Sequence, residues 1–256
     1  MGLNTEPRES REFIHELKFY LAPARAGALR DWVRERLRPD PHGGGDAGDR
    51  YQVTSAYLDT AAFDVYRRNG SFARSKYRVR RYDDSDTVFL ERKTKRGTRV
   101  CKRRSPIAME TLDALWRSRP EPSRAGYWFH RRVLGRALHP ICYISYLRLA
   151  RVGESGSGPI RLTLDENLRA WRAAGAGFEA MPAAAALAHD RLILELKYGS
   201  VMPALFKALI AEFAPVPQGI SKYRLALPAL GLPAPATKPS IPDAKPSMPE
   251  RQAIDA

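Results

Sequence analysis

Basic side chains recur at every second position in several parts of the sequence, and two of these pairs suit phosphate binding. One residue separates Arg78 from Arg80, and one separates Lys93 from Lys95. Alternate side chains on a β-strand share a face and lie about 7 Å apart. An arginine fork can hold two phosphate oxygens, and a lysine supplies a compact charge. The pairs therefore favour a ligand with several linked phosphates, although nucleic-acid-binding proteins carry similar pairs.

Carboxylates lie among these cations. Glu16, Glu91 and Glu195 each stand two residues from a lysine. They have two interpretations: partners that neutralise nearby cations, or ligands for Mg²⁺ or Mn²⁺, which prefer oxygen donors and bridge to phosphates. Glu195 is the first choice for a metal ligand, because its segment ILELKY is otherwise strongly apolar and a buried carboxylate needs a partner. Glu16 and Glu91 are candidates for further ligands.

Motifs of several other phosphate and acyl-transfer enzymes are absent from the sequence. It contains no GxxxxGK[ST] loop, no GxSxG elbow and no kinase catalytic loop. Its five histidines show no metal-binding spacing. Phosphoryl transfer by this chain would therefore proceed without a Walker-type loop.

The excess of positive charge is concentrated in one part of the chain. The 256 residues include 43 Lys and Arg against 28 Asp and Glu, a formal net charge of +15. Residues 67–104 alone hold 15 basic and 4 acidic residues. This balance indicates an anionic partner, and the apolar residues within the stretch argue against a flexible basic tail.

Strand periodicity accounts for how these residues are positioned. In six segments a charged, mostly basic face alternates with an apolar face, as in Arg78 and Arg80 against Tyr77 and Val79. The apolar faces require burial, most simply under helices. The charged faces form either a solvated surface or the lumen of a closed sheet, and a lumen lined by Arg and Lys repels itself unless a polyanion fills it. The predicted strands are 13–21, 51–59, 73–82, 87–95, 99–104, 141–151, 160–165, 168–172 and 192–198.

Helical patterns fall between the strands, over 23–37, 109–116, 126–138 and 203–213. The fold expected is α+β: an antiparallel β-tunnel, a closed barrel-like sheet with a polar basic lumen, flanked by α-helices. One domain is expected over 11–230, with a flexible N-terminus over 1–10 and a Pro/Ala-rich disordered tail over 231–256. Two irregular inserts are expected, at 39–49 and 175–189, the second a short helix or a loop.

The remaining composition favours a cytoplasmic location. Two cysteines do not form a disulfide framework. The first residues contain no apolar signal core, and no segment approaches 18 uninterrupted apolar residues, so no membrane span is expected. Nothing in the sequence specifies an oligomeric state.

The order of these motifs resembles the catalytic VTC domain (vacuolar transporter chaperone type polyphosphate polymerases) of the triphosphate tunnel metalloenzyme superfamily. The resemblance spans roughly residues 11–228, and its nine short motifs are weak singly and more specific in order. They are HELKFYL (15–21), YQVTSAYLDT (51–60), KYRVRRY (76–82), FLERKTKR (89–96), CKRR (101–104), YISYLRLAR (143–151), IRLTLDENL (160–168), ILELKY (193–198) and ISKYRLAL (220–227).

The resemblance implies a basic tunnel that transfers the γ-phosphoryl group of ATP to a growing polyphosphate chain with a divalent metal, Mn²⁺ or Mg²⁺. Its partners are then ATP and polyphosphate. The residues expected to act on the transferring phosphate are Arg78, Arg80, Lys93, Arg148 and Arg161. Those expected to bind substrate are Lys18, Lys102, Tyr146, Lys197 and Lys222, with Glu195 on the metal. Arg148, Tyr146 and Lys222 rest on the resemblance alone.

One departure from the superfamily favours the polymerase branch. The related CYTH triphosphatases and cyclases typically open with Glu-x-Glu-x-Lys, whereas this chain has Ile14 in place of the first Glu, ahead of Glu16 and Lys18. The sequence also lacks the membrane segments and phosphate-sensing domain of eukaryotic relatives, so translocation would need a separate membrane partner.

Three alternatives stay open. They are a triphosphatase or polyphosphatase in the same tunnel, a polyphosphate-binding protein without catalysis, and a nucleic-acid-binding module that stacks bases on Tyr77, Tyr82 and Phe89. Carboxylates spaced among the cations argue against the last, so no nucleic acid is expected.

Overall fold

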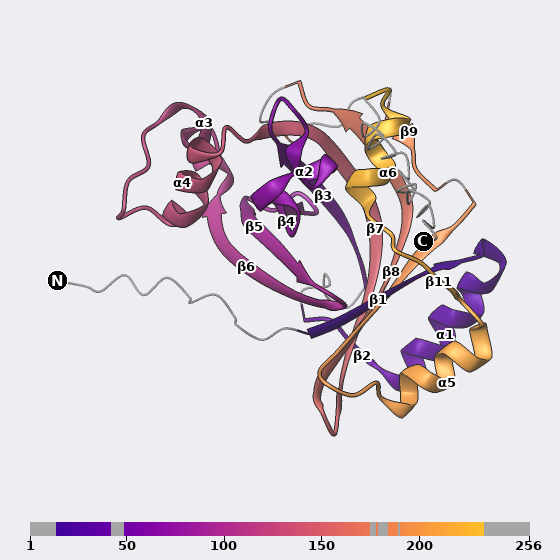
Figure 1. The fold of residues 1–256 in the computed structure, drawn as a ribbon. Coiled ribbons are helices and arrows are strands. Elements are labelled where there is room, and N and C mark those ends of the chain that lie inside the picture. Colours follow the sequence, from indigo (N-terminus) through magenta and orange to yellow (C-terminus); the bar gives the residue numbers. More distant parts are fainter. Residues whose placement is uncertain (1–13, 42–48, 175–177, 179–183, 189, 233–256) are drawn as a thin grey trace, which may run out of the picture.

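Eight antiparallel strands close into a barrel in the computed structural model, which describes residues 14–41, 49–174, 178, 184–188 and 190–232 (Figure 1). Around the ring the order is β7, β3, β4, β5, β6, β1, β10, β8 and back to β7. The α+β antiparallel tunnel predicted from the sequence is thereby confirmed. The barrel strands are β1 (Ile14–Leu21), β3 (Arg50–Asp59), β4 (Ser75–Tyr82), β5 (Thr87–Arg96), β6 (Arg99–Ala108), β7 (His139–Ser155), β8 (Gly158–Arg172) and β10 (Leu192–Tyr198).

Three two-residue strands extend the sheet beyond the ring. β2 (Arg38–Pro39) pairs with β7, β9 (Ala185–Ala186) pairs with β8, and β11 (Val216–Pro217) pairs with β1. β2 and β9 fall within or beside the two inserts, so part of each insert pairs with the barrel. The rest of both inserts, at 42–48 and in most of 175–189, lies outside the described residues, as do the expected flexible N-terminus at 1–10 and all of the expected tail at 231–256 except Gly231 and Leu232.

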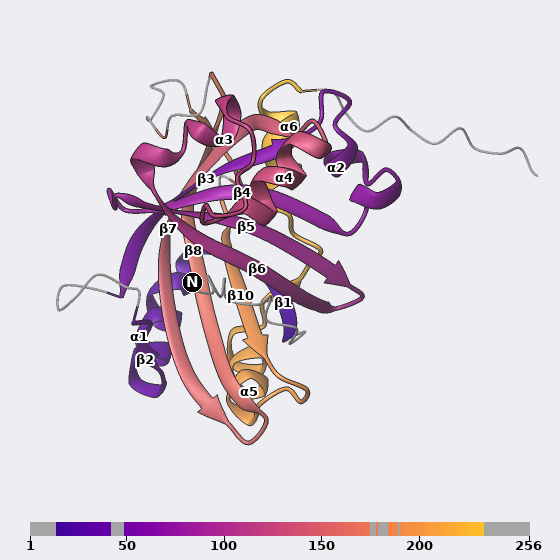
Figure 2. The ribbon, with the colours of Figure 1, turned by 90° about the vertical axis from the view of Figure 1, so that its left-hand side faces the viewer.

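Helices cover the apolar outer faces of the strands on two sides of the barrel (Figures 1 and 2). On one side, α1 (Ala26–Arg36) and α5 (Ala204–Phe213) pack against β1, β8 and β10, where Leu162, Leu194 and Phe206 are fully buried. On the other side, α4 (Tyr127–Gly135) lies with the short α3 (Ala114–Arg117) against β4–β6. Burying one such Leu or Phe side chain contributes about 1.5–3 kcal/mol, so both helical layers fix which strand face turns inward.

The strand alternation predicted from the sequence is seen directly in β4. Tyr77 and Val79 face outward and are buried, and the Tyr77 ring contacts that of Phe129 on α4. Arg78 and Arg80 project to the opposite face and line the lumen. Because side chains alternate along a strand, burying the apolar face leaves the arginines no place but the interior of the barrel.

Two predicted strands, 160–165 and 168–172, are one continuous strand, β8. The residues that separate them form a bulge: Ser145↔Arg169 and Leu147↔Glu166 are paired, so one residue of β7 opposes two of β8. Asn167 has φ 52° there, a left-handed conformation that Asn tolerates better than most residues. The break in alternation at this point is therefore a bulge and not the end of a strand.

The helical segments differ from the predicted ones in two ways: two predicted ranges are each divided into a 3₁₀ turn and a helix, and three segments were not predicted. The helix predicted over 23–37 is a 3₁₀ turn, Pro23–Arg25, followed by α1. The prediction over 109–116 corresponds to a 3₁₀ turn, Met109–Thr111, and α3. The sequence did not predict α2 (Asp64–Arg67), the 3₁₀ turn Gly70–Phe72 or α6 (Lys222–Ala229).

The pairing between β1 and β6 is short. Among the residues that the structure describes, Ile14↔Val100 and His15↔Arg99 are the pairs in register, with one further backbone bond from Glu16 N to Thr98 O at 3.4 Å. Past Glu16 the same edge of β1 pairs instead with residues 216–218: Gln218 N donates to Lys18 O, and β11 continues the pairing. The barrel wall is thus opened between β1 and the tips of β4–β6, and residues 216–221 cross this opening.

Candidate functional site in the barrel lumen

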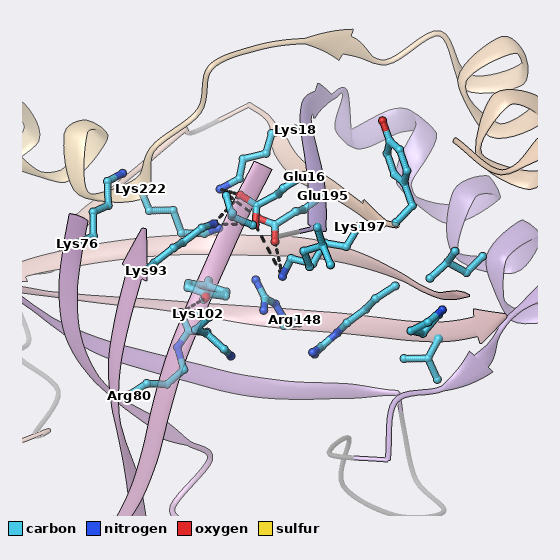
Figure 3. Close-up of a pocket in the computed structure, with 18 of the residues that line it drawn as sticks. Glu16, Lys18, Lys76, Arg80, Lys93, Lys102, Arg148, Glu195, Lys197 and Lys222 are labelled. Carbon is cyan, nitrogen blue, oxygen red and sulfur yellow. Dashed lines mark hydrogen bonds and ion pairs between the residues drawn. The ribbon is translucent and has the colours of Figure 1, made fainter. Parts of the chain in front are cut away.

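A cavity of about 480 Å³ occupies the barrel interior, and each of the eight barrel strands lines it together with the start of α6. Eleven of its lining residues are basic and three are acidic. Figure 3 shows basic side chains from separate strands converging on this space. The basic lumen expected from strand periodicity is therefore present, and its electrostatics favour a ligand with several negative charges.

One ion network in the lumen joins two carboxylates to three lysines. Glu16 and Glu195 lie on the paired strands β1 and β10, and Lys18 is within 3.5 Å of the first and 3.0 Å of the second (Figure 3). Lys93 Nζ donates to both oxygens of Glu16, at 2.5 and 2.6 Å. Lys197 lies 2.7 Å from Glu195. These five residues are called the lysine–glutamate cluster below.

The pKa values in the lysine–glutamate cluster follow from burial and mutual charge. Burial and the Glu195 carboxylate raise the pKa of Glu16, but three lysines outweigh them and lower it to about 2. Burial lowers the pKa of Lys93 to about 7 despite its contact with Glu16, because Lys18 also repels its proton. Burial lowers the pKa of Lys18, but Glu195 and Glu16 reverse the direction and raise it. Both carboxylates are therefore ionised near neutral pH, since the pKa of Glu195 is also lowered, by Lys18 and Lys197 against burial.

A second ion network joins the inward faces of β4, β5 and β6, beneath the side chains that line the cavity. Glu91 is fully buried, and one of its oxygens accepts from Arg78 Nε at 2.6 Å. The other oxygen accepts from Lys102 Nζ at 3.2 Å and lies 3.5 Å from Arg104. Burial raises the pKa of Glu91, but these cations lower it well below its ordinary value. Glu91 does not line the cavity; it holds Arg78 and Lys102 in place across three strands.

A third network connects α6 to the barrel. Asp165 on β8 accepts two bonds from Arg148, at 2.6 and 2.8 Å, and one from Lys222 Nζ at 2.5 Å. All three side chains are buried, and the two cations also lie over the Tyr146 ring. Ser221 is the N-cap of α6, and its hydroxyl accepts a hydrogen bond from Arg224 N. The N-terminus of α6 therefore sits at the lumen with Lys222 directed inward.

Other lumen cations contact neutral groups. Arg80 donates to Ser55 Oγ and to Tyr146 Oη, both at 3.0 Å. Arg78 also donates to Tyr57 Oη at 3.2 Å, and Arg78, Arg80 and Lys222 lower the pKa of Tyr57 against its burial. Lys76 Nζ bonds to Ser221 Oγ at 2.6 Å. Burial, together with Lys18 and Lys93, lowers the pKa of Lys76 well below its ordinary value. These basic side chains carry N–H groups that can donate hydrogen bonds to the oxygens of a phosphate chain.

Arg161 lies toward one end of the cavity. Its guanidinium is 2.6 Å from Asp40 and donates to Tyr51 Oη at 3.0 Å. Asp40 follows β2, in one of the two inserts predicted from sequence. This insert therefore contributes the residue that orients a lumen arginine.

The structure places nearly all of the predicted site residues on the cavity. Glu91 is the exception among them: it is buried behind the lining. Those that line the cavity are Lys18, Arg78, Arg80, Lys93, Lys102, Tyr146, Arg148, Arg161, Lys197, Lys222, Glu16 and Glu195. Their assigned roles stay predictions, since position alone does not establish them.

Some polar lining residues were not among the predicted site residues. Lys76 shares the strand parity of Arg78 and Arg80, so the same signal indicated it. Tyr57 lies on a strand without charged alternation, and Ser221 lies at a helix start that the sequence did not predict. No local pattern marked these two.

The donor set suits a divalent cation that is shared with a ligand. Glu16 and Glu195 both border the cavity and lie on adjacent strands. Mg²⁺ commonly uses one or two carboxylates and completes its shell with water and substrate phosphates. Within the described residues no group of three or more His, Cys, Asp or Glu side chains is placed to hold a metal by itself. The pair fits a metal bridged to phosphate, and Glu91 does not, since it is not exposed to the cavity.

Two solved structures show a similar fold at low sequence identity. The proposed adenylyl cyclase HpAC1 from Hippeastrum, described as having a dominant triphosphatase activity, is 17% identical with a TM-score of 0.51, over 86% of this chain and 98% of that one. A proposed adenylate cyclase from Bacillus halodurans is 13% identical with a TM-score of 0.51, over 83% and 97%. No curated protein sequence matches the chain significantly.

Across the described residues, no helix has both the length and the apolar character that crossing a membrane requires. The sequence model of the VTC domain matches residues 13–230, which include all of the barrel strands and the flanking helices. The chain therefore belongs to the VTC domain family.

Proposed function

We propose that this protein is a polyphosphate polymerase that transfers the γ-phosphoryl group of ATP to the end of a phosphate chain inside the barrel. The observation that supports this most directly is the lumen itself, in which eleven basic residues from all sides face a cavity with three acidic ones. A cavity of this charge favours polyanionic ligands, and a nucleoside triphosphate and a phosphate chain are both of this kind. Membership of the VTC domain family supports the same reaction.

The lowered pKa values of Glu16 and Glu195 favour a phosphate group over water as the acceptor. Water needs a base to remove its proton, whereas a terminal phosphate is already anionic near pH 7. Both central carboxylates contact lysines, and their pKa values are lowered, which makes them weak bases. Ile14 borders the cavity where a third carboxylate would otherwise strengthen the acidic set.

Catalysis in this site would consist mainly of alignment and charge stabilisation. Arg78, Arg80 and Arg148 hold fixed orientations through Glu91, Tyr146 and Asp165. They would bind the oxygens of the triphosphate as donors already in place. Lys93 and Lys102 would neutralise charge that accumulates on the transferring phosphoryl group, and Lys222 would bind from the α6 side. Each fixed donor of this kind contributes about 3–4 kcal/mol to lowering the barrier in well-studied enzymes.

A divalent cation, Mn²⁺ or Mg²⁺, would be held by Glu195 and Glu16 together with phosphate oxygens, and it would supply charge neutralisation at the phosphates. Lys18 and Lys197 contact the same carboxylates. They would move from carboxylate to phosphate oxygens as the ligand enters, so in the empty lumen the two carboxylates offset only part of the positive charge.

The test is incubation of purified protein with ATP, Mn²⁺ and a short polyphosphate primer, with products separated on a gel. We expect long polymer from the wild type and a loss of at least about a hundredfold in rate from Arg80→Ala, since one fixed donor is removed. Arg119→Ala, at an exposed position outside the lumen, is the matched control and should retain full rate. Full polymer synthesis by a folded Arg80→Ala protein would contradict the assignment.

A second candidate is a triphosphatase of the same fold. It is favoured by the structural likeness to HpAC1, for which a dominant triphosphatase activity is described. The same incubation separates the two reactions when released orthophosphate is measured beside the gel, because a triphosphatase hydrolyses ATP or the primer to orthophosphate and builds no polymer.

A further inference from the structure

A second cavity, of about 830 Å³, lies at the opening between β1 and β6. It is lined by the ends of β4 and β5, by the β5–β6 turn at 96–98 and by residues 217–221, which cross the opening. It shares Glu16, Lys18, Lys76, Lys93 and Ser221 with the central cavity. The two spaces therefore adjoin at the lysine–glutamate cluster, and this second space is called the side chamber below.

The side chamber carries an excess of positive charge with little to neutralise it. Seven of its lining residues are basic and one, Glu16, is acidic. Among the residues that the structure describes, Arg68, Arg74 and Lys95 have no carboxylate within ion-pair distance, and all three are exposed. Lys76 at the shared border is close enough to Lys18, Lys93, Arg224 and Arg68 for each of them to disfavour its proton.

Like charges also face each other across the strands that form the chamber. Lys76 on β4 is in register with Lys93 on β5. One step outward, Lys95 N donates to Arg74 O at 2.9 Å, so these two residues are neighbours as well. Directly opposed like charges destabilise a sheet. Two successive pairs leading from the lumen to the surface therefore form a track of cations that a bound polyanion would stabilise.

The track of cations runs from the lumen to the protein surface, and this direction indicates which ligand it would bind. Lys93 and Lys95 lie about 7 Å apart on one strand face, as two or three linked phosphates do. Lys93 contacts the central cluster, and Lys95 and Arg74 are at the exposed end. The triphosphate of a nucleotide is satisfied by the lumen alone, whereas a longer phosphate chain would extend from the lumen along this track.

Resting on the proposed function, we propose that the side chamber binds the acceptor polyphosphate chain, apart from the ATP triphosphate in the central lumen. The acceptor enters through the opening between β1 and β6 and presents its terminal phosphate at the lysine–glutamate cluster. Lys76 and Lys93 contact the last phosphates, and Arg74, Lys95 and Arg68 hold the preceding ones. The chemical class recognised is a linear inorganic phosphate chain longer than three units.

The test compares two ligands on the Arg74→Gln/Lys95→Gln variant by calorimetry at fixed salt: inorganic polyphosphate of about 15 units and a non-hydrolysable ATP analogue. Each lost cation–phosphate contact in water weakens binding roughly fivefold. We expect polyphosphate affinity to fall at least about fivefold and affinity for the ATP analogue to change less than twofold. In the polymerase assay the KM for primer should rise and the KM for ATP should not. Arg119→Gln is the control for lost surface charge.

The outcomes separate this inference from the function on which it rests. The assignment of the side chamber as the acceptor site is overturned if the variant binds polyphosphate as tightly as the wild type does, or if its affinity for both ligands falls equally. Neither result would affect the proposal that the wild type synthesises polymer. Equal competition by a single-stranded oligonucleotide of matched charge overturns the assignment to a phosphate chain. Selective loss of polyphosphate binding supports the side chamber even in a protein that makes no polymer, because binding is measured without turnover.

Discussion

Replacing Asp165 with Asn tests the link between the lumen charges and the stability of the barrel. Asp165 is fully buried and accepts three charge-assisted bonds, two from Arg148 and one from Lys222. Asn keeps the shape and one acceptor oxygen but removes the charge, so two buried cations lose their counterion. Removing one partner of a buried ion pair costs about 3–5 kcal/mol. We expect Asp165→Asn to lower the free energy of unfolding by that amount at pH 7.

The same variant should regain stability when a polyanion enters the lumen. A ligand at a hundred times its Kd stabilises the native state by about 2.7 kcal/mol. In the variant, bound tripolyphosphate would also pair with Arg148 and Lys222. Its stabilisation should therefore exceed that of the wild type at equal saturation. Urea denaturation with and without tripolyphosphate, followed by far-UV circular dichroism, measures both effects.

The control for Asp165→Asn is Glu121→Gln, which breaks an ion pair with Arg124 in which both side chains are about half exposed. An exposed pair contributes about 0–1 kcal/mol, so this variant should unfold almost as the wild type does. The reasoning is refuted if Asp165→Asn costs less than about 1 kcal/mol. It is also refuted if tripolyphosphate stabilises the variant no more than the wild type.

Two further predictions concern the lumen. Tripolyphosphate affinity should fall as pH rises from 7.5 to 9.5, because Lys102 loses its charge over this range while the ligand is already ionised. Glu91 raises the pKa of Lys102, but burial together with Arg104 and Lys197 outweighs it and lowers the pKa to about 8. Lys102→Arg keeps the charge and should flatten the calorimetric profile; an unchanged slope would exclude Lys102 as its source. Glu195→Gln should weaken Mn²⁺ binding about tenfold or more in the presence of tripolyphosphate, because one of two carboxylates is lost. Electron paramagnetic resonance measures free Mn²⁺, and wild-type binding in the variant would remove Glu195 as a ligand.

The sequence predicted the lumen well because strand alternation is a local property. Once Tyr77 and Val79 are assigned to a buried face, Arg78 and Arg80 must point the other way. The same logic placed Glu16, Lys18, Glu195 and Lys197 on the cavity. The alternation specifies which face of the strand a residue lies on, but it does not specify how deeply the side chain is buried. Glu91 has the parity of Lys93 but is buried under Arg78, Lys102 and Arg104.

What the sequence did not predict depends on contacts between distant residues. α6 is held in place by Asp165 with Lys222 and by Tyr223, whose hydroxyl donates to Asp59 at 2.7 Å across 164 residues. Asp59 also accepts from the backbone N–H groups of Thr60, Val65 and Tyr66, which fixes α2. No periodicity in either segment encodes this partnership. Tyr57 and Ser221 enter the site by the same long-range route.

The place of β1 in the ring has a consequence for how the chain folds as it is synthesised. The first strand is inserted between β6 and β10, and within the described part of the chain it is paired with β10 over seven residues and with β6 over two. The ring therefore cannot close until residue 198 has left the ribosome, and contacts of such wide sequence separation form slowly. During that interval the inward faces of β4, β5 and β6 are open to any polyanion nearby. A polyanion bound there at that stage would be enclosed when the last strand pairs and the ring closes.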